Sequence, residues 1–171
     1  GIEKGREQAA YWVGTVAEAR KVVQENAAKR PDIIKIWVDD RDHTVPKLTP
    51  ELYGAIIDEA HKANVRVTAH IFNLDDGKGL LKANVDAFAH SVRDRDVDDE
   101  FMTMIRAKPN FVVNPNLPAR GVKSDISWLQ GKLPAAEYAD VEKGNVDNGK
   151  QAAAFGIQSR NLKKLSDANV D

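Results

Sequence analysis

Ala63-Asn64-Val65-Arg66-Val67-Thr68-Ala69-His70 and Ala83-Asn84-Val85-Asp86-Ala87-Phe88-Ala89-His90 are two eight-residue stretches that begin and end alike. Each follows a helical pattern, passes through an asparagine and runs along an apolar segment to a histidine. Asn64 is suited to a left-handed helix end. The apolar segments, residues 65–71 and 85–90, are predicted strands. Such an alternation of helix and strand indicates parallel βα units.

Similar units are predicted on both sides of these stretches. Thr15 and Glu18 form a capping box that begins a helix ending near Lys29, and residues 32–38 read as a strand buried on both faces. Thr49-Pro50-Glu51 begins the helix that ends near residue 63. Further predictions are helices over 79–83, 97–107 and 152–168, a strand over 111–113, and an irregular loop or lid over 116–144.

The predicted strands imply a parent fold larger than this chain. Four parallel strands with helices on one side leave two open edges and an uncovered face. The last residues, 169–171, repeat the Asn-Val pattern that precedes a strand elsewhere. We therefore expect residues 1–171 to be one partial domain that associates, either as a homo-oligomer or with missing strands of a larger barrel.

Composition excludes several classes of function. The chain has 171 residues, a net charge of −1 and no cysteine. The absence of cysteine excludes disulfides, zinc–thiolate sites and a cysteine nucleophile. Mixed charges give no basic patch, so we expect no nucleic-acid partner. We expect no membrane span, because no apolar run approaches roughly 18 residues.

Three residues on successive predicted strands can carry chemistry. Lys35 lies within strand 32–38, while His70 and His90 end the next two strands. The carboxyl ends of parallel strands meet at one edge, where barrels build their active sites. Imidazole nitrogens suit zinc and related metals. A purely structural alternative for Lys35 is an ion pair with Asp39 or Asp40.

Four residues in the loops after the strands are weaker candidates for binding substrate: His43, Arg93, Arg95 and Asn114. The two arginines could clamp a carboxylate, but pairing within Arg93-Asp94-Arg95-Asp96 in solvent is favoured. His43 is favoured as a plain loop residue, and Asn114 suits a turn equally well. His61, on the helix over residues 49–63, is interpreted as structural.

The segments over residues 32–36, 59–70 and 83–90 together resemble the amidohydrolase superfamily, in its imidazolonepropionase-like and prolidase-like branch. The resemblance covers about residues 15–116. It implies strands four to seven of a (β/α)₈ barrel. It also implies that Lys35 is carboxylated and bridges two divalent metals, such as Zn²⁺, in the intact parent, and that His70 and His90 bind one of them.

The resemblance implies a metal-dependent hydrolase that cuts amide, cyclic amide or peptide-like C–N bonds with metal-activated water, in a small-molecule or peptide-like substrate. The family's His-x-His pair on strand one and its strand-eight aspartate have no match in this sequence. We therefore expect the chain to be inactive by itself. The alternatives are a non-catalytic structural or assembly fragment and a small α/β domain in which Lys35 holds an anion.

Overall fold

The computed structural model describes residues 10–41, 43–118 and 120–170. One sheet contains four parallel strands in the order β1-β2-β3-β4. They are β1 (Ile33–Val38), β2 (Arg66–Ile71), β3 (Ala87–Phe88) and β4 (Val112–Val113). Spatial order follows chain order, and a helix joins each strand to the next. The predicted parallel βα organisation is therefore confirmed.

Seven helices accompany the strands in the described part of the chain. They are α2 (Val16–Ala27), α3 (Pro50–Lys62), α4 (Leu74–Lys82), α5 (Asp99–Arg106), η1 (Ser127–Leu129), α6 (Ala135–Gly144) and α7 (Gly149–Asp167). Among these residues, no helix combines the length and the apolar character that crossing a bilayer requires.

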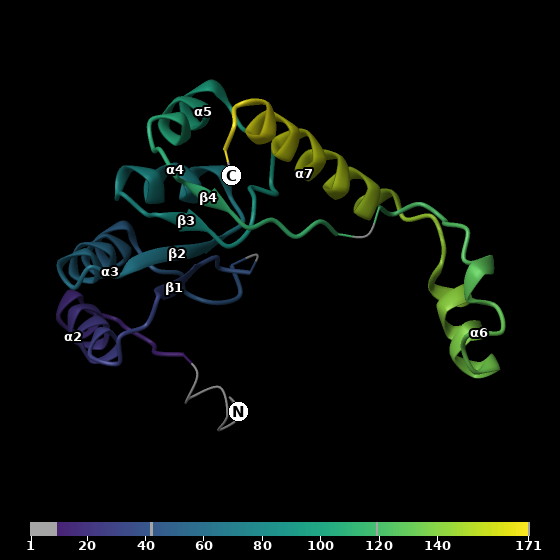
Figure 1. The fold of residues 1–171 in the computed structure, drawn as a ribbon, viewed down its shortest axis with the longest axis horizontal. Coiled ribbons are helices and arrows are strands. Elements are labelled where there is room, and N and C mark those ends of the chain that lie inside the picture. The colour runs from purple at the N-terminus through teal and green to yellow at the C-terminus, as the bar shows by residue number, and fades with distance from the viewer. Residues whose placement is uncertain (1–9, 42, 119, 171) are drawn as a thin grey trace.

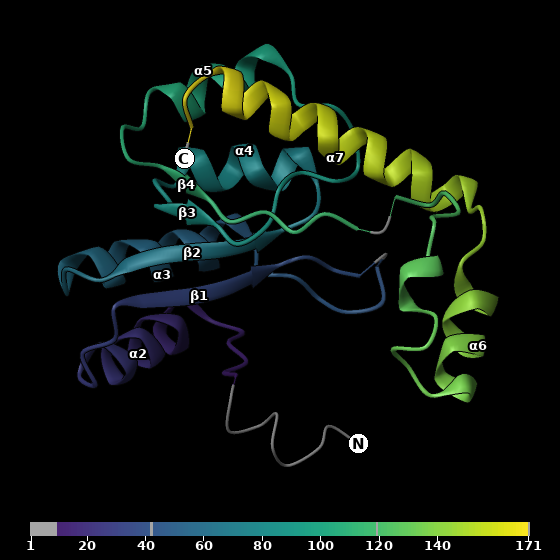
Figure 2. The ribbon, with the colours of Figure 1, turned by 45° about the vertical axis from the view of Figure 1, so that its right-hand side comes forward.

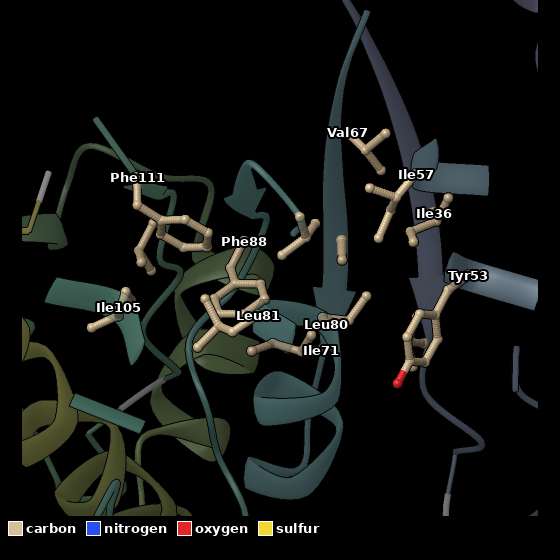
Figure 3. Close-up of a cluster of buried hydrophobic side chains, with 14 of the residues drawn as sticks. Ile36, Tyr53, Ile57, Val67, Ile71, Leu80, Leu81, Phe88, Ile105 and Phe111 are labelled. Carbon is tan, nitrogen blue, oxygen red and sulfur yellow. The ribbon is translucent and has the colours of Figure 1, made fainter. Parts of the chain in front are cut away.

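The helices α2 to α5 cover one face of the sheet, and the core lies between the two layers (Figures 1 and 2). Alternate residues of each strand point into this core, as the period of a β-strand requires. Figure 3 shows part of the resulting cluster, which includes Ile36, Ile57, Val67, Ile71, Leu80, Phe88, Ile105 and Phe111. The core fixes which strand residues remain for the opposite face.

The opposite face of the sheet has no helical cover in the described chain. Ile33, Trp37 and Val112 on this face are 40%, 42% and 41% exposed, and Lys35 is also exposed. Residues 32–38 are therefore not buried on both faces as predicted, because only alternate residues of β1 meet the helices. The uncovered face expected of four parallel strands with helices on one side is confirmed. We call this uncovered surface the open face. Its exposed apolar side chains favour association, which stays a prediction.

The predicted helix signals are confirmed at three ends. Thr15 and Glu18 form both bonds of the capping box at the start of α2. The Thr49 hydroxyl accepts from the Leu52 N–H at the start of α3. Asn64 has a φ of 58° and follows the end of α3. Local side-chain chemistry set these boundaries, so the sequence pattern could reveal them.

The helix predicted over residues 79–83 begins earlier, at Leu74. The preceding Asn73 makes no capping bond with its side chain. Instead, the Leu74 N–H donates to Asp94 Oδ1 at 2.9 Å. The bond to the first helical N–H therefore comes from a loop twenty residues further along the chain, although Asn73, Asp75 and Asp76 are local signals of a helix start.

The predicted irregular segment over residues 116–144 contains the helix α6, so that prediction is only partly right. Residues 120–148 form an arm that lies apart from the sheet, at the far end of α7 (Figures 1 and 2). Its two ends run side by side, with Ser124 and Asn145 joined by two hydrogen bonds. Neither η1 nor α6 contains a buried residue.

Two isoleucines on β1 test which face is buried. Ile36 is 7% exposed and Ile33 is 40% exposed. We expect Ile36→Ala to reduce the free energy of unfolding by roughly 2–5 kcal/mol, since it leaves a cavity in the core. Ile33→Ala should change it by under about 1 kcal/mol. Urea unfolding of the 171-residue chain measures both, and equal losses would contradict the described layering.

Candidate functional site

The candidate site begins with the register of β1 and β2 on the open face. Lys35 is paired with Thr68, and Trp37 with His70. Paired residues of neighbouring parallel strands point to the same side of the sheet. Lys35 and His70 therefore share the open face, with His70 two positions nearer the carboxyl ends of the strands.

The His70 ring is buried, although it lies on the open face. Only 4% of the residue is exposed. The Trp37 indole stacks on it, with ring centroids 3.6 Å apart and an interplanar angle of 7°. His90 meets the same ring edge-on, with centroids 4.6 Å apart. The two predicted histidines therefore come together, and Trp37 shields one of them from solvent.

Charged groups surround the His70 Nε2 atom. Asp39 Oδ2 lies 2.9 Å from it and an Arg93 guanidinium nitrogen lies 3.3 Å from it. Arg93 donates through the same nitrogen to the Ile71 carbonyl oxygen at 2.9 Å. The guanidinium also lies over the Phe72 ring, 4.8 Å from its centroid. Arg93 is thus held at the end of β2, beside His70.

Burial and neighbouring cations keep both imidazoles neutral. Burial lowers the pKa of His70 to about 4, opposed by the hydrogen bond and charge of Asp39 and helped by the charge of Arg93. Burial also lowers the pKa of His90, helped by Arg93 and Lys35 and opposed by a hydrogen bond with Asn116. At neutral pH both rings can offer a lone pair.

The Asp39 carboxylate selects one tautomer of His70. Burial raises its pKa, but hydrogen bonds from Arg41 and His70 and the charge of Arg93 outweigh burial, so the net shift is downward. An ionised carboxylate can only accept, so the shorter contact, to Asp39, places the hydrogen on Nε2, and the Arg93 nitrogen at 3.3 Å is then a close neighbour rather than a hydrogen-bond donor to this atom. Nδ1 of His70 then carries a lone pair.

Both histidines keep a ring nitrogen for a ligand. Nδ1 of His70 and Nδ1 of His90 are buried and have no hydrogen-bond partner. Such buried, unpartnered nitrogens are costly unless something else binds them. A neutral imidazole whose other nitrogen donates to a carboxylate is the arrangement found at metal-binding histidines. The His70 environment therefore fits a metal ligand.

The described residues do not form a complete metal site. Over residues 10–41, 43–118 and 120–170, no three His, Cys, Asp or Glu side chains group as ligands of one metal. Lys35 lies on the same open face as His70, and its charge acts on His90. Asp39 pairs with His70 and Asp40 with His43, so the alternative of an ion pair between these carboxylates and Lys35 is not favoured.

The four predicted substrate-binding residues are dispersed. His43 has a 92% exposed side chain, pairs with Asp40 and lines a hollow of about 370 Å³ in the loop after β1. The Asn114 N–H donates to the Phe88 carbonyl oxygen, and the residue is exposed. Of the four, only Arg93 contacts either histidine.

The expected pairing within residues 93–96 is largely wrong. Arg93 turns inward to His70, and Arg95 pairs mainly with Asp75 of α4, with Asp94 at 3.4 Å. Asp96 pairs with Arg160 of α7 at 3.0 Å. Most charged residues of this run therefore contact residues of β2, α4 and α7 instead of one another.

Two further residues of the site were missed by sequence reasoning: Trp37 and Asp39. Trp37 could have been found, because it lies two residues after Lys35 and alternate strand residues share a face. Asp39 was considered only as a partner of Lys35.

Comparison with solved structures identifies the fold. A putative prolidase from Bifidobacterium longum is 23% identical with a TM-score of 0.60, and the match covers 94% of this chain and 38% of the prolidase. The A. niger ochratoxinase is 19% identical with a TM-score of 0.61, over 94% of this chain and 36% of the ochratoxinase. The chain has the fold of part of an amidohydrolase. A Xaa-Pro dipeptidase is also similar, at 20% identity and a TM-score of 0.59 over 93% of this chain.

The resemblance to amidohydrolases and prolidases is thereby confirmed for the fold. The chain spans less than two fifths of the length of these structures, as an internal piece of a larger barrel would. An uncharacterized protein of Mycobacterium tuberculosis is 35% identical over 72 residues, which are 40% of this chain and 20% of that protein. No protein-family model matches the chain.

The buried, neutral His70 predicts acid sensitivity of the metal-free chain. Its pKa is about 4 in the folded protein and 6.5 for the free side chain. Between these values the unfolded state binds more protons, so the free energy of unfolding falls as pH falls. Between these two pH values, His70 lowers the free energy of unfolding by roughly 3 kcal/mol or less.

The matched variant is His70→Phe, which keeps an aromatic ring beside Trp37 but cannot titrate. We expect urea unfolding in EDTA to show a smaller loss of stability for this variant between about pH 7 and about pH 4.5. His43→Asn, which changes an exposed loop residue, serves as the control. Parallel pH profiles for wild type and His70→Phe would contradict a neutral buried imidazole.

Proposed function

We propose that this chain is part of a metal-dependent hydrolase that acts on amide, cyclic amide or peptide-like C–N bonds. The observation that carries the proposal is the pairing of the buried His70 ring with the half-buried His90 ring at the carboxyl ends of neighbouring strands, each with a buried and unpartnered Nδ1 atom. The fold adds support, since the solved proteins that share it include prolidases and a Xaa-Pro dipeptidase. The site would then lie where barrels carry their chemistry.

His70 and His90 would hold a divalent metal such as Zn²⁺, and a second metal would be shared through Lys35. Once bound, such metals lower the pKa of water toward about 7 and polarise a carbonyl group. Lys35 would bridge them as a carbamate: CO₂ adds to the neutral Nζ, a proton is released, and the product carries one negative charge. The open face leaves Lys35 accessible for this step.

Other residues of this chain would prepare the ligands. Asp39 accepts the Nε2 hydrogen of His70 and so directs its Nδ1 lone pair toward the site. Trp37 fixes the plane of the same ring by stacking. The charge of Arg93 adds to burial in lowering the pKa of His70, so the ring stays neutral. The remaining ligands and a general base would come from elsewhere in the parent.

Substitution of the three proposed ligands in the intact parent tests this function. We expect His70→Asn and His90→Asn to abolish hydrolysis and to lower the metal content per protein, because each removes an imidazole ligand. Lys35→Ala should do the same, and a short carboxylic acid should restore part of the activity by supplying the bridge. Metal analysis of the purified proteins accompanies the hydrolysis assay.

His61→Asn is the matched control for these variants. His61 bonds to Asp86, which also accepts from the Val67 N–H at the start of β2, so this histidine belongs to the opposite end of the sheet. We expect this variant to keep its metal. Full activity and full metal content in Lys35→Ala would contradict the proposed bridge.

The role of Asp39 is tested separately. We expect Asp39→Ala in the intact parent to weaken zinc binding by about 10–100-fold, because His70 loses the acceptor that fixes its tautomer. The neighbouring Asp40→Ala is the control, since Asp40 is also buried but pairs with His43. Zinc titration of both variants measures the difference, and equal affinities would rule out a specific role for Asp39.

A further inference from the structure

A buried asparagine on α7 contacts the loop that follows β3. Asn161 is 0% exposed and lies on the last long helix, far from the candidate site in sequence. Its Oδ1 accepts from the Val97 N–H at 2.8 Å. Its Nδ2 donates to the carbonyl oxygens of Val92 at 3.1 Å and Arg95 at 2.9 Å. All three bonds thus go to the backbone of residues 92–97.

Two neighbours on α7 contact the same loop. Arg160 pairs with Asp96 at 3.0 Å, and the Lys164 ammonium donates to the Val97 carbonyl oxygen at 2.8 Å. Both are exposed, whereas Asn161 is sealed in the interior between them. A buried amide with three good bonds fixes a backbone more strictly than surface ion pairs do. Asn161 is therefore the group that sets the path of this loop.

The loop joins α7 to the candidate site. It begins directly after His90 and carries Arg93, whose N–H donates to the Phe72 carbonyl oxygen at 2.9 Å. The Arg93 guanidinium contacts His70 and the Ile71 carbonyl oxygen. The next residue, Asp94, caps α4. Displacement of this backbone would therefore shift the groups around both histidines at once.

We propose that Asn161 is a positioning residue of the candidate site, which acts from α7 through the backbone of residues 91–97. This inference rests on the proposed function for its effect on metal binding. It also explains the placement of α7, which joins the site's supporting structure although the arm of residues 120–148 separates it from the sheet in sequence. The final helix thus contributes to the site without providing a ligand.

Two substitutions in the intact parent separate the bonds of Asn161. Asn161→Asp keeps an acceptor for the Val97 N–H but loses both donors, while Asn161→Leu loses all three bonds at similar volume. Leu165→Ala is the matched control, because Leu165 lies one turn further along α7, is 5% exposed and packs in the apolar core. All variants are measured well below their unfolding midpoints, so that a loss of global stability does not affect the comparison of exchange rates and zinc affinities.

Amide hydrogen exchange and zinc titration are the two readouts. We expect both Asn161 variants to speed exchange within residues 91–97, and only Asn161→Leu to expose the Val97 N–H fully. Zinc affinity should fall by about tenfold or more in both variants, as for other supporting groups of metal ligands. Leu165→Ala should lower the unfolding midpoint while changing zinc affinity by less than about twofold.

The two proposals fail in different ways. A wild-type parent that binds no zinc would refute the metal-dependent function, and exchange within residues 91–97 would then decide the role of Asn161 alone. Normal exchange in that loop for both Asn161 variants would overturn the inference. It would also be overturned if zinc affinity in those variants fell only as far as in Leu165→Ala.

Discussion

The in-register pairing of β1 with β2 is the constraint on which the candidate site depends. It places Trp37 beside His70 and Lys35 beside Thr68, so one face of the sheet receives all of these side chains. The apolar residues between them point to the helices and form the core. A shift of one residue would exchange the two faces, which would bury Lys35 and expose the core. The same hydrophobic burial that stabilises the sheet therefore orients the site.

Burial at the carboxyl ends of the strands gives the two histidines their chemistry. A solvent-exposed imidazole near neutral pH is partly protonated, whereas His70 and His90 are kept neutral by desolvation and by the nearby Arg93 cation. Asp39 opposes this effect on His70, but it also fixes the ring's tautomer. The neutral state of the His70 ring thus results from burial and the Arg93 cation, which lower its pKa, acting against the Asp39 carboxylate, which raises it.

Long-range polar contacts position the loop that carries Arg93 beside the two histidines. The loop after His90 is tied to β2 through Arg93, to α4 through Asp94 and to α7 through Asn161. Each tie joins residues about twenty or more positions apart.

The sequence by itself determined the parallel βα order, the helix ends with local caps and the placement of His70 and His90 at the carboxyl ends of their strands. These features depend on near neighbours in the chain, through turn chemistry, capping bonds and the alternation of apolar residues. Only the tertiary structure decided that the His70 ring is buried on the open face, that the Leu74 N–H donates to Asp94, and that Arg93 turns inward while Arg95 turns to Asp75. It also decided which groups Trp37 and Asn161 contact. Their partners lie on other strands and helices, so the energies that fix them arise only when distant segments pack together.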